Sequence, residues 1–271
     1  MNEVFDIKRL WKLMQYEVVN YIPNFFKSLL IFSSVIAATW IFSLTVDFAV
    51  LPEGRDKLVA TLFTLAVILS PFIVYKDMNN RKKGYIYAMI PASTLEKLLS
   101  MVVLCVVVVP ILSYAMLTAT DLLLWLFTKI GMGSFYSMEF YNPFTETFAT
   151  QVYDDGILTY SLPVFDGLIY FMNLVSYTIM FNTIFRKNKV LRTILFNIAM
   201  VFAFVILTSV IINITTPEFW EGIGRSLEAY FRDWTAVEGV RFLLNIIRVI
   251  SIVFTALFLA IAYFRIKRVN Y

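Results

Sequence analysis

The longest apolar run of the chain, Thr94–Phe127, reads TLEKLLSMVVLCVVVVPILSYAMLTATDLLLWLF. A bilayer core about 30 Å thick needs about 20 apolar residues in a helix, so this run can cross a membrane. Five further runs meet the same requirement. They cover residues 28–51, 57–75, 163–184, 193–214 and 242–264. The sequence therefore predicts an all-α membrane protein with six transmembrane helices in a single domain, residues 1–271.

The composition agrees with lipid as the surrounding solvent. Hydrophobic residues make up 60% of the 271 residues and charged residues 15%, whereas a soluble domain carries about a quarter charged residues. The net charge is +4 at pH 7, but Lys and Arg cluster at the ends of the apolar runs, which argues against a nucleic-acid partner. With Cys105 as its one cysteine and no His, the chain supports no intrachain disulfide and no ordinary Cys/His metal site.

The distribution of Lys and Arg predicts the orientation of the chain. Most of them lie in the N-terminal segment, the 76–97 loop, the 185–192 loop and the C-terminal segment. Loops rich in Lys and Arg stay on the cytoplasmic side of a membrane. We therefore expect a multi-pass membrane protein with both termini cytoplasmic.

The first 24 residues have the pattern of an amphipathic helix. The apolar residues at helical spacing are Ile7, Leu10, Trp11, Met14 and Val18. Polar residues on the other faces include Lys8, Lys12 and Gln15. Such a helix lies in the membrane interface, and we expect Pro23 to end it before the first span. A simple anchor and a helix that also contacts a cytoplasmic partner both remain open.

The loop at residues 76–93, between the second and third spans, has a helical pattern of its own. It carries the basic cluster Arg81, Lys82 and Lys83, followed by Tyr85, Tyr87 and Met89. We expect a short helix over residues 78–90, ended by Pro91. Ser93 and Glu96 then match a capping box at the start of the third span. A positive-inside anchor is the alternative, but side chains able to fill a pocket favour a docking segment.

Two outer segments are rich in aromatic residues. The loop at residues 128–162 combines Tyr and Phe with acids and predicts a small outer cap, which could hold a substrate, cover the pore or shield a dimer. In residues 215–240, Thr216 and Pro217 mark a helix start. The aromatic and aliphatic residues at helical spacing include Phe219, Trp220, Ile223 and Leu227. This predicts an amphipathic or re-entrant outer helix before the sixth span, with an interfacial aromatic anchor as the alternative.

Three charges fall within or near the outer ends of the spans, namely Asp121, Asp166 and Arg248. A charge at the bilayer centre costs at least ~3 kcal/mol. We expect Arg248 to pair with Asp166 or Asp121, and a proton or substrate relay is the alternative. Pro71 and Pro110 lie inside the second and third spans and predict kinks.

These features together resemble an ABC-2-type transporter permease, the transmembrane subunit of an ABC exporter. The resemblance covers the whole chain and rests on an amphipathic elbow followed by six spans. It also rests on a basic loop that runs into Pro91-Ala-Ser93-Thr-Leu-Glu96-Lys97 and on the aromatic segment before the sixth span. The sequence around Pro91 also resembles permease-like proteins of the Bacteroidetes group, which implies a location in the bacterial cytoplasmic (inner) membrane.

The resemblance implies a function for each of these segments. The 78–90 helix would be a coupling helix that docks on a separate ABC ATPase subunit. The residues of this docking region would be Arg81, Lys82, Lys83, Tyr85, Tyr87, Met89, Pro91, Ser93 and Glu96. The elbow residues Lys8, Trp11, Lys12 and Gln15 would lie beside the same subunit. A second copy of the chain would complete the pore as a homodimer, and Phe219, Trp220, Ile223 and Leu227 would form an outer gate.

The chain itself is not expected to be an enzyme. It contains no Gly-x-x-x-x-Gly-Lys-[Ser/Thr] phosphate loop, so ATP and Mg would bind to the partner subunit and this chain would bind no cofactor. Without His, a His-Glu-x-x-His metalloprotease and a serine protease with a His base are excluded. We expect export of a hydrophobic or amphipathic substrate. An ATP-independent membrane scaffold or secondary carrier is the alternative.

Overall fold

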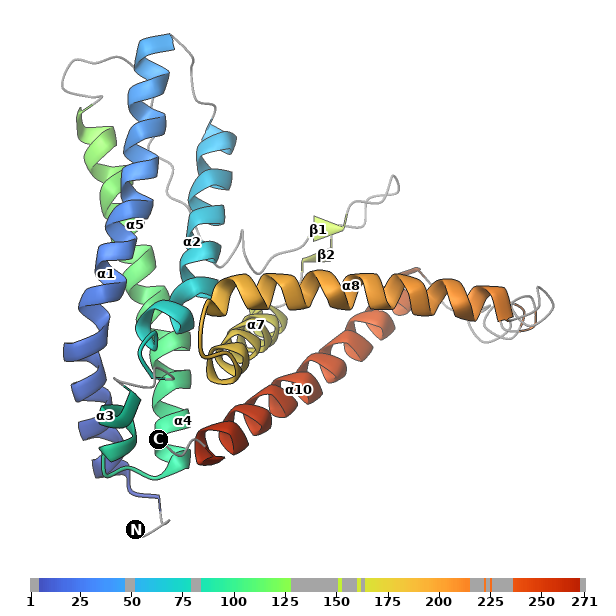
Figure 1. The fold of residues 1–271 in the computed structure, drawn as a ribbon. Coiled ribbons are helices and arrows are strands. Elements are labelled where there is room, and N and C mark those ends of the chain that lie inside the picture. The colour runs from blue at the N-terminus through green and yellow to red at the C-terminus, as the bar shows by residue number, and fades with distance from the viewer. Residues whose placement is uncertain are drawn as a thin grey trace.

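The computed structural model describes residues 5–46, 52–78, 84–127, 151–152, 160–161, 164–214, 222, 225 and 236–268 (Figure 1). Its helices are α1 (Ile7–Val46), α2 (Pro52–Val74), α3 (Gly84–Met89), α4 (Thr94–Val103), α5 (Val109–Phe127), α7 (Val164–Ile184), α8 (Lys189–Ile214) and α10 (Ala236–Arg268). A π-helix, η1 (Leu104–Val108), joins α4 to α5. The strands β1 (Gln151–Val152) and β2 (Tyr160–Ser161) pair antiparallel, with Gln151 opposite Ser161.

Six helical stretches of the described chain are long and apolar enough to cross a membrane. They are α1, α2, the continuous α4–η1–α5 stretch, α7, α8 and α10. Each of these stretches overlaps one of the six runs predicted from hydropathy, although the first covers Ile7–Phe42 where residues 28–51 were predicted. The prediction of a helical, multi-pass membrane protein is therefore confirmed.

The predicted break at Pro23 is wrong, because α1 continues through this residue as one helix of 40 residues. A proline inside a helix removes one backbone hydrogen bond and costs about 3 kcal/mol. Phe25 and Leu29, in the turns that follow, are fully buried. The packing of these two side chains in the core holds α1 continuous through Pro23.

In the first turns of α1, one side packs against the rest of the chain and most of the predicted apolar face stays exposed. Leu10, Leu13 and Glu17 are buried, whereas Ile7 is 70% exposed and Trp11 is 60% exposed. The buried side is the one that packs against α4. The exposed face keeps its apolar residues and stays available to lipid or to a partner.

The predicted irregularity at Pro110 takes the form of the π-helix η1. The backbone N–H of Val109 donates to the carbonyl of Leu104, five residues earlier, directly before the proline. Because Pro110 has no N–H, it cannot donate the α-helical hydrogen bond to the carbonyl of Val106, four residues earlier. A one-turn π-segment is a known way to absorb such a defect inside a helix.

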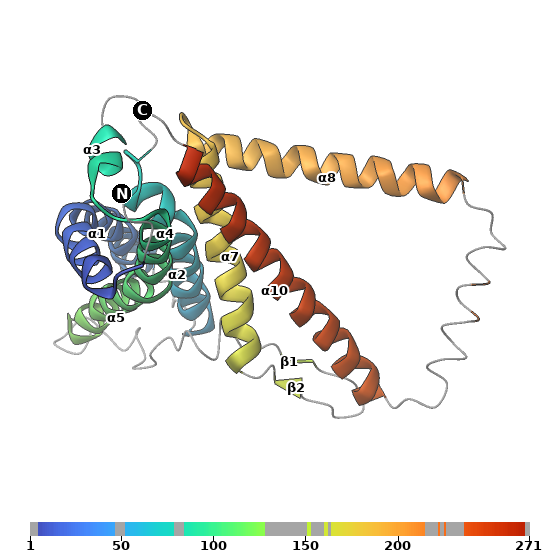
Figure 2. The same ribbon diagram turned by 90° about the horizontal axis from the view of Figure 1, so that it is seen from below.

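The core of the molecule lies among α1, α2 and the α4–η1–α5 stretch, which run side by side (Figure 1). Fully buried residues include Ile36 of α1, Val67 of α2, and Met101 and Cys105 of the third stretch. On the other side of α2 lies α7, and α10 crosses α7 obliquely (Figure 2). Asn173 of α7 joins these two helices, since its side-chain amide donates to the Ser251 carbonyl at 2.9 Å.

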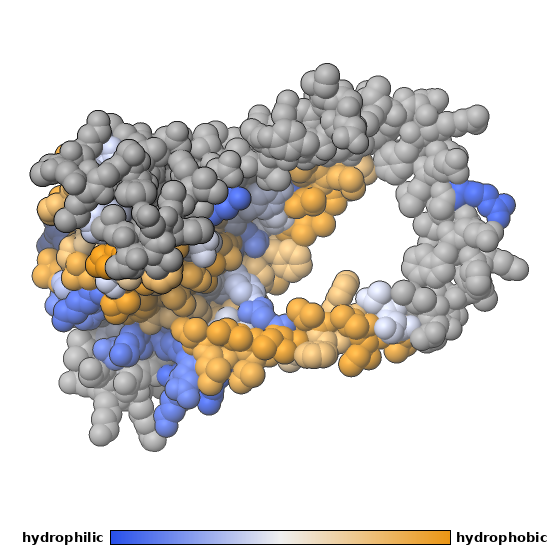
Figure 3. Space-filling model, turned by 90° about the horizontal axis from the view of Figure 1, so that it is seen from above, coloured by the Kyte–Doolittle hydropathy of each residue, from blue (hydrophilic) through white to orange (hydrophobic). Residues whose placement is uncertain are grey.

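The helix α8 leaves this bundle at its first turn and projects away from it (Figures 1 and 2). Every residue from Ile194 to Ile211 is exposed. The surface of α8 is apolar along its length (Figure 3). A helix that is hydrophobic all round is typical of a membrane span or a protein interior.

Candidate functional site

The start of α4 has the predicted capping box. The Ser93 hydroxyl accepts a hydrogen bond from the Glu96 backbone N–H at 3.2 Å, and the Glu96 Oε2 accepts one from the Ser93 N–H at 2.8 Å. Two of the backbone donors that a helix start leaves unpaired are thereby satisfied. The third span therefore begins at a fixed point directly after the loop that carries α3.

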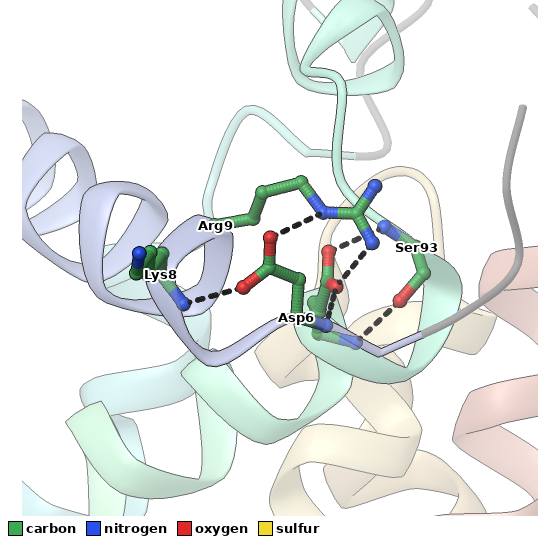
Figure 4. Close-up of polar contacts among 5 residues, drawn as sticks. Asp6, Lys8, Arg9 and Ser93 are labelled. Atoms are coloured by element: carbon green, nitrogen blue, oxygen red, sulfur yellow. Dashed lines mark hydrogen bonds and ion pairs between the residues drawn. The ribbon is translucent and has the colours of Figure 1, made fainter.

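The second oxygen of Glu96 holds the beginning of α1. Its Oε1 accepts from the Asp6 backbone N–H at 2.7 Å and from the Arg9 guanidinium at 3.0 Å. Figure 4 shows Asp6, Arg9 and Ser93 converging at this point. The Glu96 side chain is 0% exposed, and hydrogen bonds between ionised groups are about twice as strong as neutral ones. One buried carboxylate thus ties the starts of α1 and α4 together.

A second buried carboxyl, Glu17 of α1, lies where four elements meet. Its Oε2 accepts from the Tyr75 hydroxyl at the end of α2, at 2.8 Å, and from the Ser100 hydroxyl of α4. The Lys97 ammonium of α4 also interacts electrostatically with this carboxyl, and the Tyr87 hydroxyl of α3 is buried near it. We call these five residues the Glu17 cluster. Buried polar groups of this kind are costly to separate.

The helix α3 is fixed to this cluster through Tyr87. The Lys97 ammonium donates to the Tyr87 carbonyl at 3.0 Å and lies 5.3 Å from the centre of its ring. The Tyr75 ring meets the Tyr87 ring edge-on at 6.4 Å between centroids. Tyr87 is only 4% exposed. The expectation that Tyr87 points outward to a partner is corrected, because its ring packs inside its own chain.

The other residues of the predicted docking region are placed as follows. Met89 is 76% exposed, and Pro91 is exposed beside it. The helix α3 is shorter than predicted, since Met78 belongs to a turn at the end of α2, where its N–H donates to the Tyr75 carbonyl. Arg81, Lys82, Lys83 and the side chain of Tyr85 lie outside the described residues.

The elbow residues lie on the exposed face of α1. Lys8, Trp11, Lys12 and Gln15 are all exposed, on the side away from Leu10, Leu13 and Glu17. This face begins beside Asp6 and Arg9, the two residues that Glu96 binds. The exposed start of α1 and the end of the α3 loop are therefore joined through one side chain.

Lys189 forms a third buried polar centre. Its ammonium donates to the Tyr75 carbonyl at 3.0 Å, the Lys76 carbonyl at 3.1 Å and the Asn182 side-chain oxygen at 2.7 Å. It thereby joins the end of α2 to α7 and to the start of α8. A cation at this place satisfies carbonyls that the end of a helix leaves unpaired.

Sequence reasoning missed Glu17 and Lys189. Glu17 follows Leu10 and Leu13 at helical spacing, so an acid on an apolar face was the signal that could have identified it. Lys189 carried no comparable signal. It lies in the basic 185–192 loop, and the preference of Lys and Arg for the cytoplasmic side already accounts for a lysine there.

Several predicted sites lie wholly or partly outside the described residues. Asp121 of α5 is buried and Arg248 of α10 is half-buried, while the Asp166 side chain is outside the description, so their pairing stays a prediction. The predicted outer gate also stays a prediction, because its residues lie outside the described part of the chain, namely Phe219, Trp220, Ile223 and Leu227. The 128–162 loop is described only at β1 and β2. Within the described part, no group of three or more His, Cys, Asp or Glu side chains is placed to hold a metal.

No family model, curated protein or solved structure matches this chain. Its function must therefore be argued from the sequence and from the three buried polar centres at the ends of the helices.

Proposed function

We propose that this chain is the membrane-spanning permease subunit of an ATP-driven ABC transporter, exporting a hydrophobic or amphipathic substrate. The observation that carries the proposal is the attachment of α3 to the spans. Tyr87 of α3 contacts Lys97 of α4 and Tyr75 at the end of α2. A short helix outside the spans that is bound this firmly to them is suited to pass on a push from outside the bilayer.

The Glu17 cluster supplies the mechanical link. Separating a buried hydrogen-bonded polar group from its partner costs about 1–3 kcal/mol, and several such contacts join α1, α2, α3 and α4 here. These four ends therefore move as one body. The π-helix before Pro110 is the point above them where α5 can tilt relative to α4.

The proposed partner is a separate ATPase subunit, which would hold ATP and Mg. Its contact surface on this chain would be the exposed Met89 together with Lys8, Trp11 and Lys12 on the exposed face of α1. Both termini would face the cytoplasm at the inner membrane, by the positive-inside distribution of charge. A second copy of the chain would complete the pore.

An ATP-independent scaffold or secondary carrier is the competing function, and one observation favours it. Tyr87 is turned into its own chain, so the segment needs no partner to bury its largest described side chain. Transport by such a carrier would be driven by an ion gradient alone.

Labelling with a photoreactive ATP analogue separates these functions. We expect the chain, purified from its native membrane in mild detergent, to carry a labelled second subunit. Met89→Asp should remove most of that subunit, whereas Lys187→Asp, which makes a larger change of charge at another exposed position, should leave it. Transport driven by an ion gradient in liposomes that contain this chain alone would overturn the proposal.

A further inference from the structure

A cavity of about 1060 Å³ lies among α1, the end of α2 and the start of α8. Since α2 ends at Val74 and α8 begins at Lys189, the cavity lies at the boundary between apolar spans and polar loops. Its walls match that position. Phe72 and Leu191 line it with apolar surface, and the polar residues come from the neighbouring loops and from α1.

The lining of the cavity is positively charged. Its cations are Lys76, Arg186 and Lys189, and its one acid is Asp77. Asp77 interacts electrostatically with Lys189, so these two charges offset each other. Lys76 and Arg186 are exposed and leave the lining with an excess of positive charge.

The backbone around the cavity adds to this preference for an anion. Two bonds from the Lys189 ammonium, to the Tyr75 and Lys76 carbonyls, cover the negative end of α2. The first turn of α8, whose N–H groups have no partners within the helix, also lines the cavity at Leu191. Such N–H groups attract anions.

The wall formed by α1 carries hydrogen-bonding side chains. Tyr21, Asn24 and Ser28 line the cavity and follow one another at spacings of three and four residues, which places them on one face of the helix. A phosphate has several acceptor oxygens, and the Tyr21 hydroxyl and the Asn24 amide are donors for them, whereas the Ser28 hydroxyl donates to the Asn24 carbonyl.

We propose that this cavity binds a phosphate-bearing anion, with Arg186 and Lys76 pairing with its oxygens. The planar guanidinium of an arginine fits a phosphate with two parallel hydrogen bonds. The phosphate could belong to the headgroup of an anionic phospholipid or to free inorganic phosphate. The apolar wall at Phe72 and Leu191 would then lie against the glycerol and acyl part of a lipid.

Native mass spectrometry of the full chain in mild detergent tests the proposal. We expect the unmodified protein to retain phosphatidylglycerol and not phosphatidylcholine. The double variant Lys76→Gln with Arg186→Gln should retain phosphatidylglycerol at least about tenfold more weakly, because two charge-assisted hydrogen bonds are lost. The matched control is Lys187→Gln with Arg268→Gln, two exposed cations outside the cavity, and should behave as the parent.

Competition identifies the source of the phosphate. Displacement of phosphatidylglycerol by excess inorganic phosphate supports a site for the free anion, and retention under the same conditions supports a lipid site. Equal retention of phosphatidylcholine by the unmodified protein would overturn the proposal. So would an equal loss in the control double variant.

Discussion

The guanidinium of Arg9 donates to the Glu96 carboxylate at 3.0 Å, across 87 positions of the chain. The same carboxylate closes the capping box of α4 with Ser93. The sequence pattern assigns Glu96 to the start of α4 alone, but its side chain also holds the start of α1. If the start of α1 moved away from α4, the buried Glu96 carboxylate would lose its bonds to Asp6 and Arg9.

Removing the charge of Glu96 should lower the stability of the protein. We expect Glu96→Gln to lower the free energy of unfolding by about 1–3 kcal/mol. The bond to Arg9 loses its ionic character, and the donors of Asp6, Arg9 and Ser93 no longer meet a carboxylate. Unfolding in detergent, followed by circular dichroism, measures this. Lys8→Gln, a change at an exposed neighbour, should stay within about 0.5 kcal/mol; equal losses in both variants would contradict the assignment.

The Glu17 cluster predicts different costs for two tyrosines of similar chemistry. Tyr75→Phe removes a donor to the buried Glu17 and should cost about 1–3 kcal/mol. Tyr16→Phe removes a hydroxyl from an exposed side chain and should cost less than about 0.5 kcal/mol. The same unfolding measurement applies, and a Tyr75→Phe variant as stable as the parent would show that the cluster contributes nothing.

Lys189 predicts a local loss of structure. In Lys189→Met, the carbonyls of Tyr75 and Lys76 lose the ammonium that binds them, and each unsatisfied buried acceptor costs about 1–3 kcal/mol. Amide hydrogen exchange should become faster at the end of α2 and the start of α8. Lys187→Met, in the exposed loop nearby, is the control, and unchanged exchange in the Lys189 variant would contradict this role.

The π-helix before Pro110 predicts that this proline matters for motion. Pro110→Ala restores a backbone donor and should favour an uninterrupted α-helix by up to about 3 kcal/mol. If α5 tilts at this point during transport, the variant should be more resistant to unfolding but slower in transport. The control is Pro23→Ala, which removes a proline from a helix that is already continuous and should leave the transport rate unchanged. If Pro110→Ala transported at the same rate as the parent, η1 would have no role in transport.

The spans were predictable from the sequence because their signal is local. A window of apolar residues such as Thr94–Phe127 can be recognised without knowing its neighbours, and the structure confirms it as one stretch. The capping box of Ser93 and Glu96 was predictable for the same reason, since both partners lie within four residues.

The site was only partly predictable because its contacts are not local. Tyr87 turns inward on account of Tyr75 and Lys97, and Glu17 is buried because α2 and α4 bring donors to it. The continuity of α1 through Pro23 likewise depends on the packing of Phe25 and Leu29 in the core. These outcomes follow from tertiary packing, which overrides the local preferences that a sequence displays.

The central claim, that a separate ATPase docks at the end of α3, is tested most directly by photocrosslinking from position 89. A photoreactive phenylalanine analogue replaces Met89 in the full chain in its native membrane, and a parallel sample carries it at Lys187. We predict an adduct between position 89 and a subunit that also takes up a photoreactive ATP analogue, with none from position 187. Adducts from position 89 to lipid alone, or equal adducts from both positions, would contradict the claim.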